Sequence, residues 1–153
     1  MKNGADMAIA DFNAAGGVLG KKLALDDRGR RLRSQAGVLG RREDRQLQDS
    51  VRAGHYCSSS SIPASEAYAD SNVLQMTPAS TNPLFAERKL WNVARVCGRD
   101  DQQGTVAGDY IAKNFKGKNI AILNDKTTYG KRLGNETKKA LNKAGVTEKM
   151  FES

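Results

Sequence analysis

The sequence has few of the residues that metal sites and disulfide scaffolds need. Its 153 residues include two cysteines, Cys57 and Cys97, and one histidine, His55. The cysteines are too few and too far apart for a zinc site and lack the dense pattern of a small secreted scaffold. They could form one disulfide or none. His55 has no second metal-ligating residue type nearby, so we expect a packing or capping role, no metal and no cofactor.

Long apolar stretches are also missing. No run approaches the roughly 20 apolar residues that a transmembrane helix needs, so we predict no membrane span. The first six residues, MKNGAD, do not show the charged and then apolar pattern of a secretory signal. We therefore expect that the chain either stays in the cytoplasm or has lost its true N-terminus. The length alone predicts one domain.

The net charge of +8 is concentrated in one block. Eight of the twelve arginines fall within residues 27–52, which carry half of the net charge. Such a block can indicate nucleic-acid binding, but this one has no aromatic residues between its basic residues and no recognisable nucleic-acid motif. Neither helical nor strand periodicity holds there. We expect no nucleic-acid partner, and the alternative predicts DNA affinity that depends on salt.

Outside this block, apolar residues alternate between helical and strand spacing. Helices are predicted over residues 1–15, from near Pro63, and over 103–115 and 131–144, and strands over 22–25, 73–76, 91–96, 119–123 and 146–151. This alternation predicts an α/β fold with a parallel sheet. The polar connector at residues 98–101 is the best domain boundary. Because the chain begins in a helix and stops in a strand, we expect a truncated protein.

One polar loop follows a further expected strand, and two others follow strands named above. Residues 57–61 are rich in serine and precede a helix, and residues 77–83 follow the next strand. Because the carboxyl ends of parallel strands meet at one edge, the first loop can hold a carboxylate and the second an ammonium. Residues 125–130 lie at the same end of a later strand, where Tyr129 could form an aromatic wall. Taken singly, each loop could also be an ordinary capped or Pro-bounded turn.

Four sequence strings, in order and at natural spacing, resemble the periplasmic leucine/isoleucine/valine-binding proteins. They are residues 53–65 (AGHYCSSSSIPAS), 75–83 (QMTPASTNP), 91–104 (WNVARVCGRDDQQG) and 120–130 (IAILNDKTTYG). Residues 3–21 are similar to the first helix of that family. Together, residues 3–21 and the four strings leave only about residues 26–52 with no resemblance to the family.

The resemblance implies a type I periplasmic-binding-protein fold, in which two parallel-sheet α/β lobes close on an amino acid, and which is incomplete here. Residues 1–98 would form most of lobe one and residues 99–153 the first part of lobe two. It further implies the solute-binding component of an ABC importer, periplasmic in the intact family member and monomeric, with a membrane permease as its partner. Such a protein binds a branched-chain or related aliphatic amino acid and is not an enzyme.

The resemblance also implies a role for each ligand-binding residue. Ser58 would bind the ligand carboxylate through its hydroxyl and N–H, and Ala79 would offer its carbonyl oxygen to the ammonium. Thr81 would bridge the carboxylate and the ammonium, and Ser80 would line the cleft. Tyr129 would cover the ligand upon closure. Turnover that depended on Ser58 would contradict this assignment.

One family feature is missing from the basic block. The family has a cysteine that pairs with the one at Cys57, in an Asp-Ala-Cys-Asp-Pro string, where this chain has arginines. One set of codons for residues 30–37 encodes Asp-Ala-Cys-Asp-Pro-Lys-Gln once its first base is dropped. We therefore expect residues 27–52 to be translated out of frame. The alternative for the whole chain is an inactive fragment or pseudogene product.

Overall fold

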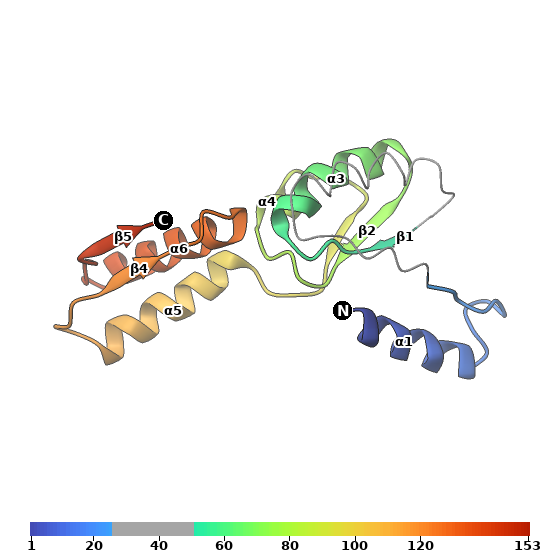
Figure 1. Ribbon diagram of the computed structural model, residues 1–153, viewed down its shortest axis with the longest axis horizontal. Coiled ribbons are helices and arrows are strands. Elements are labelled where there is room, and N and C mark those ends of the chain that lie inside the picture. The colour runs from blue at the N-terminus through green and yellow to red at the C-terminus, as the bar shows by residue number, and fades with distance from the viewer. Residues whose placement is uncertain (26–50) are drawn as a thin grey trace. The chain divides into compact units, whose positions relative to one another are not determined.

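The computed structural model describes residues 1–25 and 51–153 (Figure 1). The chain divides into two compact units, Met1–Arg31 and Leu32–Ser153. We expect a shifted reading frame over residues 27–52. Residues 27–50 of this segment lie outside the described residues. Within the described ranges, no helix is long and apolar enough to cross a membrane.

The first unit contains helix α1 (Lys2–Ala14), which confirms the predicted helix. At its end, the N–H of Gly17 donates to the carbonyl oxygen of Phe12 at 2.7 Å. The predicted strand over residues 22–25 is wrong, because these residues form no strand. They are held instead by the side chain of Asn13, which donates to the carbonyl oxygen of Leu23 at 2.8 Å and accepts from its N–H at 2.7 Å.

The second unit contains a three-stranded parallel sheet in the order β1-β2-β3. The strands are β1 (Val51–Ala53), β2 (Leu74–Thr77) and β3 (Val93–Arg95), and the last two confirm predicted strands. Helix α3 (Ser58–Asp70) connects β1 to β2 and lies against this sheet (Figure 1). The short helix α4 (Leu84–Glu87), which the sequence pattern did not predict, lies between β2 and β3.

A small core joins α3 to the sheet. Ala64, Tyr68 and Val73 form its buried cluster. The ring of His55 stacks on Tyr68, and its Nε2 lies 2.9 Å from the tyrosine hydroxyl, which confirms the expected packing role of His55. The side-chain amide of Asn92 is fully buried and donates to the carbonyl oxygens of Ser65 and Val73 at 3.1 and 3.0 Å. Polar groups therefore hold much of this core together.

The second sheet of this unit pairs β4 (Ala121–Leu123) with β5 (Met150–Glu152) in parallel. Helix α5 (Asp100–Asn114) precedes it, and helix α6 (Thr128–Lys143) connects its two strands. Both helices and β4 confirm predicted elements. The helices start earlier than predicted, because α5 takes in the acidic end of the connector and α6 takes in the residues after its cap, Thr127.

Two glycines allow α5 and α6 to pack closely together. A Cβ atom at Gly104 would lie 2.8 Å from the backbone nitrogen of Thr137, and one at Gly108 would lie 2.5 Å from the Cβ of Ala140. These distances are shorter than normal van der Waals contacts, so any larger residue would force the helices apart. The close crossing therefore depends on the Gly104 and Gly108 pair.

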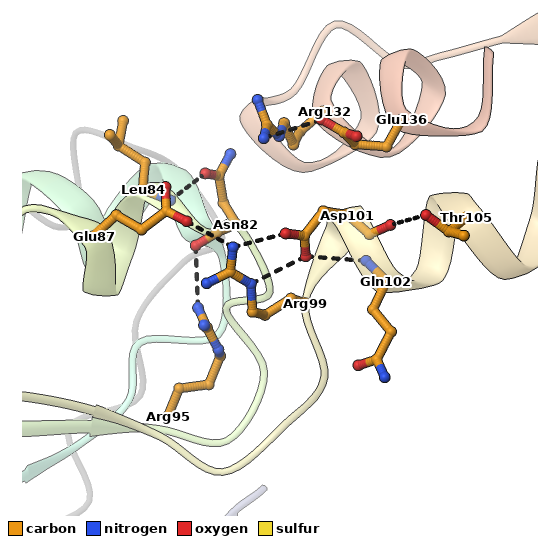
Figure 2. Close-up of polar contacts among 10 residues, drawn as sticks. All are labelled: Asn82, Leu84, Glu87, Arg95, Arg99, Asp101, Gln102, Thr105, Arg132 and Glu136. Carbon is orange, nitrogen blue, oxygen red and sulfur yellow. Dashed lines mark hydrogen bonds and ion pairs between the residues drawn. The ribbon is translucent and has the colours of Figure 1, made fainter. Parts of the chain in front are cut away.

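Arg99 fastens the start of α5 to α4 (Figure 2). Its guanidinium donates to both carboxylate oxygens of Asp101 at 3.0 and 2.7 Å and to Glu87 at 2.6 Å. Hydrogen bonding to Arg99 is the main reason that the pKa of Asp101 is lowered to about 2. This ion-pair group ties the connector between the two sheets to α4.

We predict that Gly108→Ala lowers the free energy of unfolding by about 1–3 kcal/mol, because overpacking against Ala140 outweighs the better helix propensity of alanine. Gly98→Ala is the matched control, because the nearest atom to a Cβ there is 3.9 Å away. Its effect should stay within about 1 kcal/mol. Urea denaturation measures both, and equal effects would contradict the close crossing.

We predict that Arg99→Ala lowers the free energy of unfolding at pH 6 by at most about 1 kcal/mol, because the pair is partly exposed. The folded-state pKa of Asp101, about 2, lies below the usual value of 3.8. Its contribution is therefore complete above the unfolded pKa and disappears as the pH falls toward 2. Urea denaturation between pH 6 and 2 should show the wild type and the variant converging. Lys113→Ala, which removes an exposed cation from the same helix, should show no convergence.

Candidate functional site

The loops after β1 and β2 meet at one edge of the first sheet, as the sequence predicts for parallel neighbours. They are joined through the carbonyl oxygen of His55, which accepts from the hydroxyl of Thr77 at 2.8 Å and from those of Ser61 and Ser80 at 3.3 Å. These three donors are all fully buried, so water cannot easily replace them. The carbonyl oxygen of His55 therefore fixes both loops and the first turn of α3 in one arrangement.

The serine run forms the start of α3 and not a loop. The sequence predicted a helix from near Pro63, whereas α3 begins at Ser58 and contains Pro63. Serine has a weak helix preference, but Ser58 and Ser61 are buried and bonded to the neighbouring loop. These tertiary contacts extend the helix to the sheet edge.

Ser58 combines a helix N-terminus with a hydroxyl group. The first N–H groups of a helix have no partner within the helix, and the helix dipole makes them attractive to an anion. The Ser58 hydroxyl accepts from the N–H of Asn82 at 3.3 Å, so its own proton is left to donate elsewhere. This end of α3 therefore suits a carboxylate.

Asn82 connects the loop after β2 to its surroundings (Figure 2). Its carbonyl oxygen accepts from Arg95 at 3.2 Å, and its side-chain oxygen accepts from the N–H of Leu84 at 2.9 Å. Its side-chain nitrogen donates to the carbonyl oxygen of Thr128 at 3.4 Å. The loop that carries Ala79 and Thr81 is thus held on several sides.

A cavity of about 440 Å³ opens beside these loops. Its walls come from the loop after β1 with the start of α3, from the loops after β2 and β3, and from the loop that leads into α6. The lining residues are Tyr56, Cys57, Ser58, Ser59, Ala79, Thr81, Cys97, Asp125, Thr127 and Tyr129. The structure therefore brings together four of the five residues predicted from the sequence: Ser58, Ala79, Thr81 and Tyr129.

Ser80, the fifth predicted residue, is not among the lining residues. It is fully buried, its hydroxyl lies 2.7 Å from that of Ser61, and its one proton is shared between the carbonyl oxygens of Tyr56 at 3.1 Å and His55 at 3.3 Å. Ala79 and Thr81 line the cavity, whereas Ser80 between them is buried in the interior. Ser80 therefore holds the two loops together from their buried side.

The loop before α6 brings an acidic group to the cavity. Asp125 accepts from the N–H and the hydroxyl of Thr127 at 3.1 and 2.7 Å, and the hydroxyl of Thr127 accepts from the N–H of Gly130 at 2.9 Å. The hydrogen bonds from Thr127 lower the pKa of Asp125, so its carboxylate stays charged. As far as the described part of the chain shows, no lysine or arginine lines the cavity. The wall therefore suits a zwitterion or cation better than a free anion.

Sequence reasoning missed several lining residues. Cys97 lies in a string that resembles the family, but nothing in its type or spacing marked it as facing a cavity. Asp125 stands in a loop whose position at the sheet edge was predicted, and only Tyr129 was chosen from it. The Asp-x-Thr spacing before a helix is typical of a capped turn and could have pointed to Asp125.

Both thiols of the chain line the cavity. Cys57 and Cys97 are free and partly exposed, and they form no disulfide. Burial is the main cause that raises the pKa of each thiol, and the charge of Asp125 adds to the effect at Cys57. Within residues 1–25 and 51–153, no group of three or more metal-ligating side chains could hold a metal ion.

We predict that both cavity thiols react slowly at neutral pH, because a raised pKa leaves little thiolate. The single-thiol variants Cys57→Ser and Cys97→Ser, treated with iodoacetamide and followed by mass spectrometry, separate the two groups. Each should be alkylated more slowly at pH 8 than free cysteine in the same tube, and the rate should keep rising beyond pH 9. Alkylation of either thiol as fast as free cysteine at pH 8 would contradict the burial described above.

Curated relatives match the chain over almost all of its length. An amino acid binding protein of Pseudomonas aeruginosa is 46% identical over 151 residues, which are 97% of this chain and 40% of that protein. Leu/Ile/Val-binding protein homolog 1 of Brucella abortus is 43% identical over 154 residues, covering 99% of this chain and 41% of that protein. The chain spans about 40% of the length of these relatives.

Solved structures share the fold at lower sequence identity. A branched-chain amino acid transporter substrate-binding protein of Streptococcus pneumoniae, in complex with isoleucine, matches 99% of this chain with a TM-score of 0.87 and 18% identity. A leucine-binding protein of Thermotoga maritima matches 94% of it with a TM-score of 0.84 and 23% identity. The match covers 43% and 41% of these two chains.

A family model described as periplasmic binding protein matches residues 1–151. Because this match spans nearly the whole chain and the structural neighbours have the expected α/β fold, the resemblance noted in the sequence is confirmed, and the chain belongs to the periplasmic binding protein family.

Proposed function

We propose that this chain captures an aliphatic amino acid of the leucine, isoleucine or valine type in the cavity at the edge of its first sheet. The observation that supports this proposal most is the meeting of Ser58, Ala79 and Thr81 at one cavity, from two loops anchored on His55. A free amino acid needs a donor site and an acceptor site a few ångströms apart, and separate loops supply them.

The carboxylate end of the ligand is assigned to Ser58. It is the first residue of α3, where backbone N–H groups and the helix dipole favour a negative charge. Its hydroxyl proton is left to donate, because Asn82 supplies the hydrogen bond that the oxygen accepts. No charged side chain is needed at this end.

The ammonium end is assigned to the loop after β2. Ala79 and Thr81 line the same cavity, and the carbonyl oxygen of Ala79 and the hydroxyl of Thr81 would accept from the ammonium, while the carboxylate of Asp125 adds a negative charge. Tyr129 is partly exposed beside them and would cover the aliphatic side chain. Such a site binds its ligand reversibly and does no chemistry on it.

We assign the intact protein to the solute-binding component of an ABC importer, located in the periplasm, acting as a monomer and delivering its ligand to a membrane permease. The names of the relatives and structural neighbours support this assignment. We place the boundary between the two lobes after residue 98, where the chain leaves the first sheet for α5. We still expect a shifted reading frame over residues 27–52.

We predict that Ser58→Ala weakens leucine binding by about 10-fold or more, because a hydrogen bond to a charged group contributes about 1.5–3 kcal/mol. Isothermal titration calorimetry with leucine measures the affinity of the wild type and the variant. Thr105→Ala is the matched control, because it removes an exposed hydroxyl from α5 that does not line the cavity.

The Thr105→Ala variant should bind as the wild type does. If Ser58→Ala also binds leucine like the wild type, the carboxylate is held elsewhere and the assignment is wrong. If the folded wild type gives no heat with leucine, isoleucine or valine, the proposed function itself fails.

A further inference from the structure

A buried carboxyl group lies behind the ammonium wall of the cavity. Asp100, the first residue of α5, is fully buried. Among the residues that the structure describes, neither of its carboxylate oxygens has a hydrogen-bond partner of standard geometry. An ionised carboxylate is costly to bury without hydrogen bonds, so a native protein that keeps one there has a use for it.

Thr81 lies next to Asp100 and carries a hydroxyl group. The N–H of Asp100 donates to the carbonyl oxygen of Thr81 at 3.0 Å, which holds the two residues side by side. The Thr81 hydroxyl is also buried and has no partner of standard geometry in the described part of the chain. Its nearness nevertheless lowers the pKa of Asp100, against burial, which is the larger effect and raises it.

Two arginines act on the same carboxyl group. Arg132 and Arg95 both favour its charged form, while Asp101 disfavours it. Arg132 pairs with Glu136 at 3.0 Å, and Arg95 donates to the carbonyl oxygen of Asn82 (Figure 2). Arg132, Arg95 and the Thr81 hydroxyl therefore all favour the charged form of Asp100.

The direction of the Thr81 hydroxyl decides what Thr81 can bind. A hydroxyl group has one proton to donate and two lone pairs to accept with. If its proton points to Asp100, the lone pairs are left for the cavity, where Thr81 lies on the wall. The oxygen then accepts from an ammonium group. If the proton points into the cavity instead, the hydroxyl would prefer a carboxylate.

We propose that Asp100 is a positioning residue that takes the proton of the Thr81 hydroxyl and so turns the lone pairs of Thr81 toward the ammonium group of the ligand. This inference rests on the proposed amino-acid capture. Asp100 does not touch the ligand, because it is not among the residues that line the cavity. It acts through Thr81 and makes the site selective for an amino acid over the corresponding acid without an amino group.

The test compares two ligands that differ only in the ammonium group, leucine and 4-methylpentanoate, by isothermal titration calorimetry on the full chain. The wild type should prefer leucine. Asp100→Ala should weaken leucine binding by about 10-fold and change 4-methylpentanoate binding by less than about 2-fold, because only the ammonium contact is lost. Asp100→Asn, which keeps an acceptor oxygen of similar shape, should fall between the wild type and Asp100→Ala.

Asp101→Ala is the matched control. It removes the next carboxylate along the same helix turn, one that pairs with Arg99, and should leave the ratio of the two affinities unchanged. A second control is the cycle with Thr81→Val, which removes the hydroxyl at nearly constant shape. The Asp100→Ala effect on leucine should disappear in that background.

The outcomes separate this inference from the proposed function. Equal weakening of both ligands by Asp100→Ala, or no change in either, would overturn the positioning role while the wild type still binds leucine. If Asp100→Ala does not fold, the same comparison with Asp100→Asn decides: an unchanged preference for leucine would overturn the role. A wild type that binds no amino acid would overturn the proposed function and this inference with it.

Discussion

The structure of the site depends on the carbonyl oxygen of His55 and the buried hydroxyl groups that donate to it. Thr77 comes from the end of β2, Ser80 from the loop that follows, and Ser61 from the first turns of α3. None of these groups can meet water, so each must find its partner within the protein. Satisfying them fixes the two loops against each other, which the proposed capture of an amino acid with two charged ends requires. The site is therefore a consequence of how a polar core is satisfied.

Much of the fold could be predicted from the sequence, and the errors have a common physical cause. Helices α1, α5 and α6 show apolar spacing or clear end signals, and β2, β3 and β4 are short apolar runs between turns. The start of α3 could not be read in this way, because Ser58 and Ser61 become helical through hydrogen bonds to another loop. Residues 22–25 alternate as a strand does, but in the described part of the chain they form no strand, and the side chain of Asn13 bonds to Leu23 instead. Contacts between segments decide these places, and a local pattern does not contain them.

The same distinction applies to the cavity. Ser58, Ala79, Thr81 and Tyr129 were expected at one site because the topology places the ends of parallel strands together, and the family resemblance chose among the residues there. The direction of Ser80 was not predictable from residue type, because a serine suits a cavity wall and a buried hydrogen-bond network equally well. Asp100 gave no signal at all in the sequence. Its proposed role is argued from its burial and its backbone hydrogen bond to Thr81, which only the structure shows.

The central claim is that the edge of the first sheet holds an amino acid with its carboxylate at the start of α3 and its ammonium at the loop after β2. The most direct measurement is a titration of the ¹⁵N-labelled chain with leucine, followed by the backbone amide resonances in two-dimensional NMR spectra. We expect saturable shifts concentrated at Ser58, Ser59, Ala79 and Thr81, with the resonances of α1 unchanged. Shifts confined to other parts of the chain, or none at saturating leucine, would contradict it.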